Sequence, residues 1–307
     1  MRNKFAELIY KNGKKNNDIY LIAADISPAG SIKKFREEHP ERFINVGVAE
    51  QVMIGISAGL AMRGKKPFAY TIAAFSLYRP FEMIRDDLCY QNLPVTIVGM
   101  GAGTIYSNLG GTHMTQEDIS IAKSIPNMKI ISPADSLELE SSINYCLKNK
   151  KGPIYLRIGK SGEKNFTKES KQKWIFGKIR NIVNGNKIAI ITYGPIIKLA
   201  FEVKKKFKNK SNNFSIYSCH TLKPLDKDGI KKILKKYKYV IILEDHSEIN
   251  SLCSDIKNIA FDNRNKTKIL SFSLKDKFFH TYENQEDMLN LHGISVEKIF
   301  NKMISLK

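Results

Sequence analysis

Short apolar runs recur along the chain and alternate with longer segments that have one apolar face. In the first half the runs cover 18–24, 43–46, 66–72, 94–100, 125–135 and 152–158. In the second half they cover 187–193, 214–219, 239–244 and 268–273. Helical periodicity lies between them, notably at 50–61, 136–149, 196–208, 227–237 and 247–258. Strands separated by helices predict parallel βαβ units, so we expect an α/β protein with two doubly wound domains.

The two halves are separated by a polar stretch in which the apolar period is lost. The sequence GKSGEKNFTKESKQK is rich in Lys, Ser and Glu and has few residues that could enter a core. Such composition is typical of a linker. We therefore predict a first domain at 1–165, a linker at 166–182 and a second domain at 183–307.

Composition indicates a globular protein. Hydrophobic residues make up 42% of the 307 residues, and no run of eighteen apolar residues occurs. The N-terminal MRNKFAELIYKNGKKNND lacks the apolar core of a signal peptide, so we expect a cytoplasmic protein without a membrane span. Its four cysteines are scattered without CxxC spacing, so neither a zinc site nor structural disulfides are expected.

The formal charge of +20 raises the question of an acidic partner. Many lysines follow the outer faces of predicted helices, as in Lys204 to Lys206 and the cluster from Lys231 to Lys236. No aromatic residues or recognition motif accompany these lysines. We therefore expect solvated faces, with an acidic protein or an anionic metabolite as the alternative, and no binding to nucleic acid.

One acid, Glu50, stands out at the start of a predicted helix. It follows the strand at 43–46 and a turn at Gly47, and the helix after it is rich in Gly, Ala and Ser. Another backbone can pack closely against such a helix. A buried carboxyl group tends to keep its proton and to act as a hydrogen-bond donor. The alternative is an ordinary first-turn acid favoured by the helix dipole.

Two loops lie where open α/β sheets bind ligands, at the carboxyl ends of strands. The first, DISPAGS, follows the strand at 18–24 and contains Ser27. The second, GAGTIYSNLGGTHMTQED, follows the strand at 94–100. A loop as long as the second is usually functional in a compact domain.

Several motifs together resemble the transketolase-like thiamine diphosphate enzymes. GVAEQ, TIAAFSLY, GGTHMTQED, IPNM and SPADSLE resemble the pyrimidine-binding domain, whereas TLKPLD and LEDH resemble the C-terminal domain. The resemblance covers nearly the whole chain in the family's order. It is most similar to split transketolases, in which this half is a separate subunit.

The resemblance implies a role for each matching residue in the cofactor site. Glu50 would bind the pyrimidine N1′ and stabilise the imino tautomer, whose own nitrogen removes the thiazolium proton. Phe75 would stack on the aminopyrimidine, with Ile72 and Tyr78 beside it. Taken alone, Phe75 is more typical of an ordinary core residue. Arg79 continues the motif, and we expect it to reach across an interface.

Other residues are implied to bind substrate. His113 of the GGTH loop would face the thiazolium and the substrate oxygens, where an imidazole can move protons near neutral pH. Arg157 and Lys160 match basic positions for a substrate phosphate, and Ser27 is placed with them. Two departures mark the donor pocket: Met100 and Gly101 replace the usual Thr-His pair, and Leu109 stands where an acid is usual. These changes leave the identity of the donor and the acceptor open.

A missing motif predicts a partner. In this family a GDG motif with paired asparagines holds the diphosphate and Mg²⁺, and this sequence contains no GDG. We therefore expect a large subunit carrying that motif, no metal ligands on this chain, and a heterotetramer with two copies of each chain. The expected activity is transfer of a two-carbon ketol unit from a ketose or ketose phosphate to an aldehyde.

Two alternatives remain. A relative that uses a 2-oxoacid, such as a 2-oxoacid dehydrogenase β subunit or a deoxyxylulose phosphate synthase-like protein, would share the cofactor motifs. A noncatalytic subunit would explain the altered donor pocket, but Glu50, Phe75 and His113 argue against it.

Overall fold

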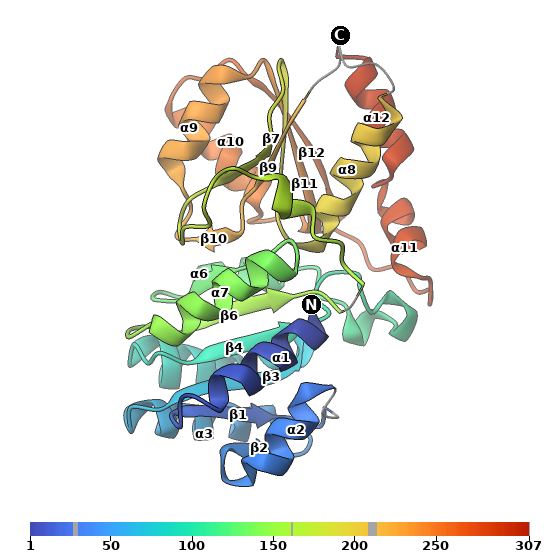
Figure 1. Cartoon of the computed structure of the whole chain (residues 1–307). Coiled ribbons are helices and arrows are strands. Elements are labelled where there is room, and N and C mark those ends of the chain that lie inside the picture. The colour runs from blue at the N-terminus through green and yellow to red at the C-terminus, as the bar shows by residue number, and fades with distance from the viewer. Residues whose placement is uncertain (27–29, 161, 208–213, 307) are drawn as a thin grey trace.

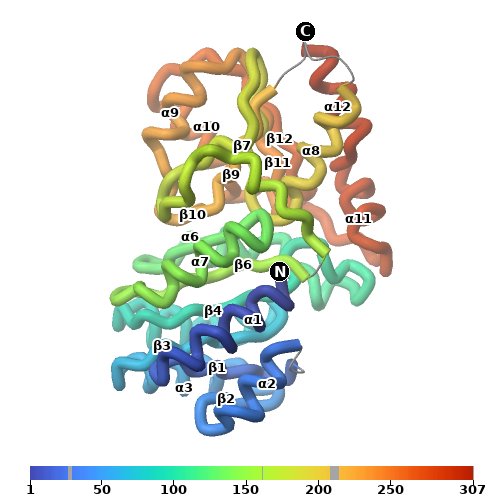
Figure 2. Tube along the Cα trace, viewed as in Figure 1, coloured from blue at the N-terminus to red at the C-terminus, as the bar shows by residue number. Residues whose placement is uncertain are grey.

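Two lobes, each built around one sheet, are stacked in the computed structural model, which describes residues 1–26, 30–160, 162–207 and 214–306 (Figure 1). The first half of the chain forms one lobe and the second half forms the other. Figure 2 shows the chain passing between them along one side of the molecule. Ser27 lies outside the described residues. No described helix has both the length and the apolarity needed to span a bilayer.

The first lobe contains a seven-stranded sheet in the order β10-β5-β6-β4-β3-β1-β2. All neighbouring strands in it are parallel except β10 and β5. Its first six strands are β1 Ile19–Ala23, β2 Phe43–Asn45, β3 Lys66–Ile72, β4 Thr96–Met100, β5 Lys129–Ile131 and β6 Ile154–Ile158. Each lies within an apolar run that predicted it.

Helices cover both faces of this sheet, as expected for a doubly wound domain. They are α1 Arg2–Gly13, α2 Ser31–Glu38, α3 Glu50–Met62, α4 Ala73–Leu77, α5 Phe81–Met83, α6 Asp118–Ser124 and α7 Ser136–Lys148. Short helical turns are η1 Pro40–Arg42, η2 Ile84–Tyr90, η3 Ser107–Leu109 and η4 Gly111–His113. On one face α3 packs Met53 and Ile54 into the core, and on the other α1 packs Phe5. Asp135 caps α7 by accepting hydrogen bonds from the amides of Leu137 and Glu138.

The second lobe has a five-stranded sheet in the order β12-β11-β8-β9-β7. Its strands are β7 Arg180–Val183, β8 Ile188–Thr192, β9 Ser215–Ser218, β11 Tyr239–Ser247 and β12 Lys268–Leu274. Its helical elements are η6 Gly194–Ile196, α8 Ile197–Lys206, α9 Lys227–Lys236, α10 Leu252–Asp262, α11 Gln285–His292 and α12 Val296–Ile304. Only the pairing of β7 with β9 is antiparallel. The prediction of an α/β protein with parallel sheets is confirmed in both lobes.

One strand of the second half belongs to the first sheet. β10, Thr221–Lys223, pairs antiparallel with β5, so a segment that follows β9 crosses to the other lobe. The predicted linker contains η5, Phe166–Glu169, and its last residues enter β7. The exact domain boundaries stay predictions. The crossing strand ties the two lobes together at one edge.

A buried polar network joins the lobes at their centre. The Arg157 side chain on β6 donates to the Asp118 carboxylate at 2.8 Å and to the Asp245 carbonyl oxygen at 2.8 Å. Both Arg157 and Asp118 are almost fully buried. Burial alone would lower the pKa of Arg157, but Asp118 together with Asp245 and two tyrosines more than offsets this, and the pKa lies above its ordinary value. The charged Arg157 side chain therefore connects the two lobes.

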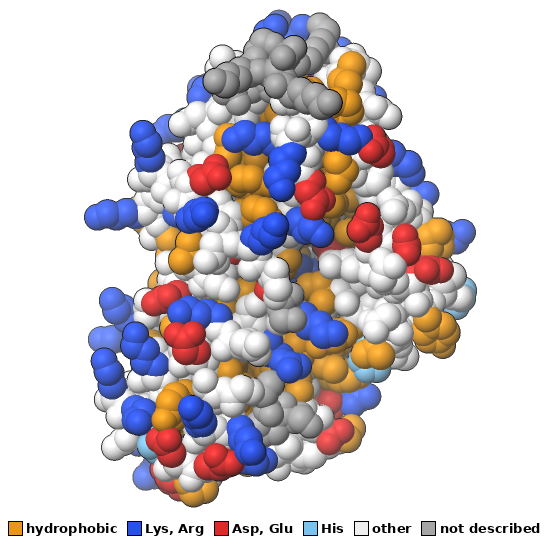
Figure 3. All heavy atoms as spheres, turned by 45° about the vertical axis from the view of Figure 1, so that its right-hand side comes forward, with side chains coloured by type: hydrophobic (Ala, Val, Ile, Leu, Met, Phe, Trp, Pro, Cys, Tyr) orange, Lys and Arg blue, Asp and Glu red, His pale blue; other side chains and the backbone are white. Residues whose placement is uncertain are grey.

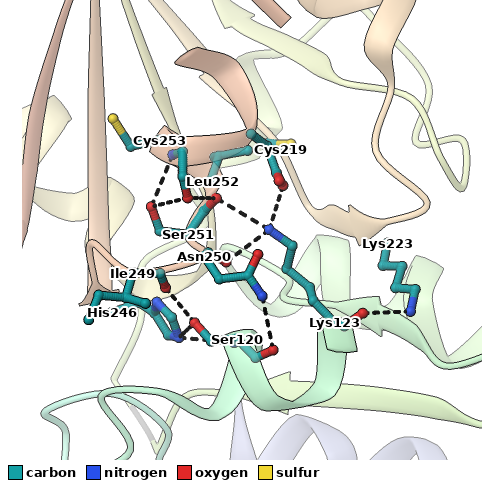
Figure 4. A network of polar contacts seen from close by, with 12 residues as sticks. Ser120, Lys123, Cys219, Lys223, His246, Ile249, Asn250, Ser251, Leu252 and Cys253 are labelled. Carbon is teal, nitrogen blue, oxygen red and sulfur yellow. Dashed lines mark hydrogen bonds and ion pairs between the residues drawn. The ribbon is translucent and has the colours of Figure 1, made fainter. Parts of the chain in front are cut away.

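Helix α6 adds a second set of ties (Figure 4). The Lys123 ammonium donates to the carbonyl oxygens of Asn250, at 2.9 Å, and Ser251, at 3.3 Å. The Ser120 amide donates to His246 Nε2 at 3.3 Å. Burial lowers the pKa of His246 to about 4, so this ring is neutral near pH 7. The neutral ring can accept that hydrogen bond.

The central tie yields a stability prediction. Replacing Arg157 with Met leaves the Asp118 carboxylate buried without its cation, and we expect a loss of about 3–5 kcal/mol in the free energy of unfolding. Urea denaturation of the purified chain measures it. Lys178→Met is the control, because Lys178 is exposed and its partner Asp226 keeps hydrogen bonds from the amides of Ile179 and Gly229. It should change stability by less than about 1 kcal/mol. Equal effects of the two substitutions would contradict the assignment.

Candidate active site

Glu50 is the first residue of α3, and its side chain is 3% exposed. The chain reaches it from β2 through a turn at Gly47, whose φ is +69° and whose amide donates to Asn45 Oδ1 at 3.0 Å. Glycine adopts this conformation without strain. The predicted burial of Glu50 is therefore present in the structure. A simple first-turn acid facing solvent does not fit this geometry.

The Glu50 carboxylate has a partner from the same chain. The Arg79 guanidinium donates from one nitrogen to both carboxylate oxygens, at 3.0 and 3.2 Å. Arg79 thus contacts its own domain in this structure, and its expected contact across an interface stays a prediction. Its side chain is 45% exposed. The buried acid is thus satisfied by a cation at the surface.

Phe75 lies at the centre of this group of side chains. The Arg79 guanidinium lies over its ring at 4.4 Å from the centroid. The His113 ring contacts it edge-on, with centroids 5.1 Å apart and planes at 72°. Phe75 is half-buried rather than enclosed in the core. The structure therefore brings Glu50, Phe75 and His113 together, although they are distant in the sequence.

The break between α4 and α5 places Arg79 in this position. Helix α4 ends at Leu77, and α5 begins at Phe81 directly after Pro80. A proline disfavours helical backbone at the residue before it, so the helix cannot continue through Arg79. Pro80 stands directly before α5 as its N-cap residue.

Ile72 and Tyr78 flank the aromatic residue along the chain. Ile72 is the last residue of β3 and precedes α4. Tyr78 follows α4 and is half-buried, with its phenol near Glu117 and Asp118. Burial raises the pKa of Tyr78 far above its ordinary value, so the phenol is neutral. Their role in cofactor binding stays a prediction.

The loop that carries His113 is held by the second lobe. The Thr104 amide and hydroxyl both donate to the Asp245 carboxylate, at 3.0 Å to the same oxygen. The Gly103 amide donates to Thr115 Oγ1 at 2.7 Å, which closes the loop on itself. Sequence reasoning missed the contribution of Asp245, because it lies far along the chain.

The altered donor positions are filled by Tyr106. Its phenol donates to the Met100 sulfur at 2.9 Å, and its ring occupies the space that a Cβ at Gly101 would need. Leu109 is 45% exposed at the end of a short helical turn. The Thr-His pair that the resemblance implies is therefore replaced by an aromatic ring and a thioether. The sequence indicated the missing polar groups but not what replaces them.

The predicted substrate cations differ in their surroundings. Arg157 is buried in the network between the lobes, and this geometry supports a structural role. The Lys160 ammonium lies over the Tyr106 ring at 4.8 Å. Lys160 also lines a cavity of about 500 Å³ with Lys164, Lys198 and Lys205. That lining does not include Glu50, Phe75 or His113.

Among the described residues, no cluster of His, Cys, Asp or Glu could hold a metal ion.

The His113 loop gives a testable requirement for glycine. Gly103 has φ of +76°, and a Cβ there would overlap the Asp245 carboxylate. We expect Gly103→Ala to lower the free energy of unfolding by about 2 kcal/mol or more, measured by urea denaturation. Gly111→Ala is the matched control, because its φ is not positive and no atom lies within 4 Å of its added Cβ. A neutral Gly103→Ala would show that Asp245 does not fix this loop.

Known proteins are similar to this chain over most or nearly all of its length. Residues 1–162 match the family described as transketolase, pyrimidine binding domain, and residues 177–299 match transketolase, C-terminal domain. A protein named as a transketolase C-terminal section in Methanocaldococcus jannaschii is 32% identical over 305 residues, covering 99% of this chain and 95% of that protein. The 6-deoxy-6-sulfo-D-fructose transketolase subunit of a Clostridium species is 31% identical over 254 residues, covering 83% and 78%.

Two further similarities concern architecture. The chain covers 48% of the 1-deoxy-D-xylulose-5-phosphate synthase of Clostridium perfringens, at 29% identity over 98% of its own length. A solved split gene transketolase, described as an inactive beta4 tetramer, aligns with a TM-score of 0.85 at 26% identity, covering 99% of this chain and 96% of that one. The chain therefore belongs to the transketolase family and carries that family's pyrimidine-binding and C-terminal domains.

Proposed function

We propose that the chain is the pyrimidine-side subunit of a two-chain, thiamine diphosphate-dependent transketolase. It would transfer a two-carbon ketol unit from a ketose or ketose phosphate to an aldehyde acceptor. The observation that carries the proposal is the buried Glu50 carboxyl group beside the half-buried ring of Phe75, with His113 against the same ring. Membership of the transketolase family supports it.

The residues present suit the pyrimidine end of this cofactor. The space over Phe75 and next to Glu50 already holds a flat N–H donor, the Arg79 guanidinium. An aminopyrimidine is also flat and has nitrogens that can hydrogen-bond a carboxyl group. When bound, thiamine diphosphate supplies the carbon nucleophile and the electron sink for ketol transfer.

Each residue of the site has a specific task in this proposal. Glu50 holds a proton against the pyrimidine ring nitrogen, in a position where water does not compete for it. Phe75 stacks on the heterocycle, with Ile72 and Tyr78 beside it. His113 gives or takes a proton at the substrate oxygens. Lys160 binds the anionic end of the substrate next to Tyr106.

A partner subunit would complete the cleft. It would carry the diphosphate and Mg²⁺ motif that this sequence lacks, in a heterotetramer. The outer face of α3 is open for such contact: Val52 and Met62 are 51% and 66% exposed. Gly55 and Gly59 have no atom within 4 Å of where a Cβ would lie, so another backbone can approach closely.

A 2-oxoacid donor is the second candidate. The apolar pairing of Met100 with Tyr106 and the exposed Leu109 leave few groups to recognise ketose hydroxyls. Release of carbon dioxide from pyruvate by the reconstituted pair would favour this candidate over ketol transfer between sugars.

Lys and Arg side chains are scattered over both lobes on the face shown in Figure 3, with acidic side chains between them. This distribution supports solvated faces over a continuous nucleic-acid stripe. The proposal therefore includes no nucleic-acid partner.

Substitution of Glu50 tests the proposal. With the partner subunit, thiamine diphosphate and Mg²⁺, we expect Glu50→Gln to lower kcat by about 10²-fold or more, because the amide cannot supply the proton. Coupled assays of ketol transfer to an aldehyde measure it. Glu82→Gln, at an exposed acid on α5, is the control and should keep normal activity. Retention of more than about a tenth of kcat by Glu50→Gln would remove Glu50 from this role.

A further inference from the structure

Among the described residues, the Arg79 guanidinium has two hydrogen bonds and one ring contact, and these are with residues of the proposed pyrimidine site. One guanidinium nitrogen donates to both oxygens of Glu50, and the group lies over the ring of Phe75 at 4.4 Å. A flat cation thus stacks on the aromatic residue and hydrogen-bonds the buried acid at the same time. These are the two contacts that the proposed function gives to the aminopyrimidine.

The two occupants exclude each other, for reasons of space and of chemistry. A heterocycle cannot stack on the face of Phe75 that a guanidinium covers at 4.4 Å. A carboxylate that receives guanidinium hydrogen bonds acts as an acceptor, whereas the proposed task of Glu50 is to donate to a ring nitrogen. Because Arg79 donates to both Glu50 oxygens, neither oxygen is free to present a proton to a ring nitrogen. Arg79 must therefore leave before the site can work.

We propose that Arg79 is a placeholder that occupies the pyrimidine site until the cofactor arrives and then swings out toward solvent. This inference rests on the proposed function and extends it to the way the cofactor enters.

The structure indicates which of the two side chains moves. Glu50 is 3% exposed and fixed at the first turn of α3, whereas the Arg79 side chain is 45% exposed in the break between α4 and α5. In the described part of the chain, the guanidinium is held only by Glu50 and Phe75. Arg79 can therefore withdraw without breaking other packing.

A placeholder stabilises a chain that, in the proposed function, supplies only the pyrimidine side of the cofactor site. Without Arg79, the buried Glu50 carboxylate would have no partner before assembly, which is strongly unfavourable. With Arg79 in place, the aminopyrimidine binds only those molecules from which Arg79 has withdrawn. Its apparent affinity is therefore the intrinsic affinity multiplied by that fraction of molecules. Productive binding then depends on the additional contacts that a partner subunit offers to the diphosphate.

The test uses the full chain and the probe 4-amino-5-hydroxymethyl-2-methylpyrimidine, which carries the aminopyrimidine alone. Isothermal titration should show that Arg79→Ala binds this probe about five- to tenfold more tightly than the unmodified chain, because no guanidinium must be displaced. The free Arg79→Ala chain should also melt about 2–4 °C lower, and saturating probe should restore its melting temperature. Arg85→Ala is the matched control, because Arg85 is exposed and pairs with Asp86 at the surface. It should bind like the unmodified chain.

Further variants distinguish failure of the placeholder proposal from failure of the proposed pyrimidine site. Arg79→Gln, which keeps most of the side-chain length without the charge, replaces Arg79→Ala if that variant does not fold, and it should also bind more tightly. Equal, weaker or unmeasurable binding by a folded Arg79 variant would overturn the placeholder. The proposed pyrimidine site itself fails in a different way: Glu50→Gln and Phe75→Ala would then bind the probe as well as the unmodified chain does.

Discussion

A carboxyl group taken out of water at the first turn of a helix needs a hydrogen-bonding partner, and this need governs the geometry of the candidate site. Glu50 is almost fully buried, so its oxygens cannot rely on solvent. Arg79 satisfies them from the same chain, and a heterocycle would satisfy them in the assembled enzyme. In the proposal, the buried Glu50 carboxyl group therefore has a hydrogen-bonding partner both before and after the cofactor binds: first Arg79 and then the aminopyrimidine.

The second lobe supports this site although it supplies none of the proposed catalytic side chains. The loop that carries His113 is fixed through Thr104 to Asp245, and Arg157 joins Asp118 of α6 to the Asp245 backbone. These buried polar contacts are directional, so they set the position of the loop as well as its stability. The second lobe therefore fixes the position of the loop that carries His113 in the first lobe.

The sequence predicts the elements of this fold much better than the contacts between them. Long apolar runs such as 66–72 and 239–244 have enough length and periodicity to indicate strands, and both are strands in the structure. β10 has three residues and leaves its own lobe, so no local pattern could reveal its partner. The pairing of Arg79 with Glu50 was likewise hidden, because the two residues lie 29 positions apart and the motif around Arg79 does not indicate which acid it contacts.

Tyr106 is another residue whose contacts the sequence does not reveal, and these contacts affect which substrate the site can recognise. The sequence indicates that polar groups are missing at Gly101 and Leu109, but only the structure shows that an aromatic ring covers Gly101 and that its hydroxyl is already used by Met100. A site that hydrogen-bonds a substrate hydroxyl rejects analogues without it strongly, whereas an apolar wall discriminates weakly between the two. Selection of the donor must then come from another part of the substrate. Lys160, which lies on the same tyrosine ring, favours an anionic end as the recognised feature.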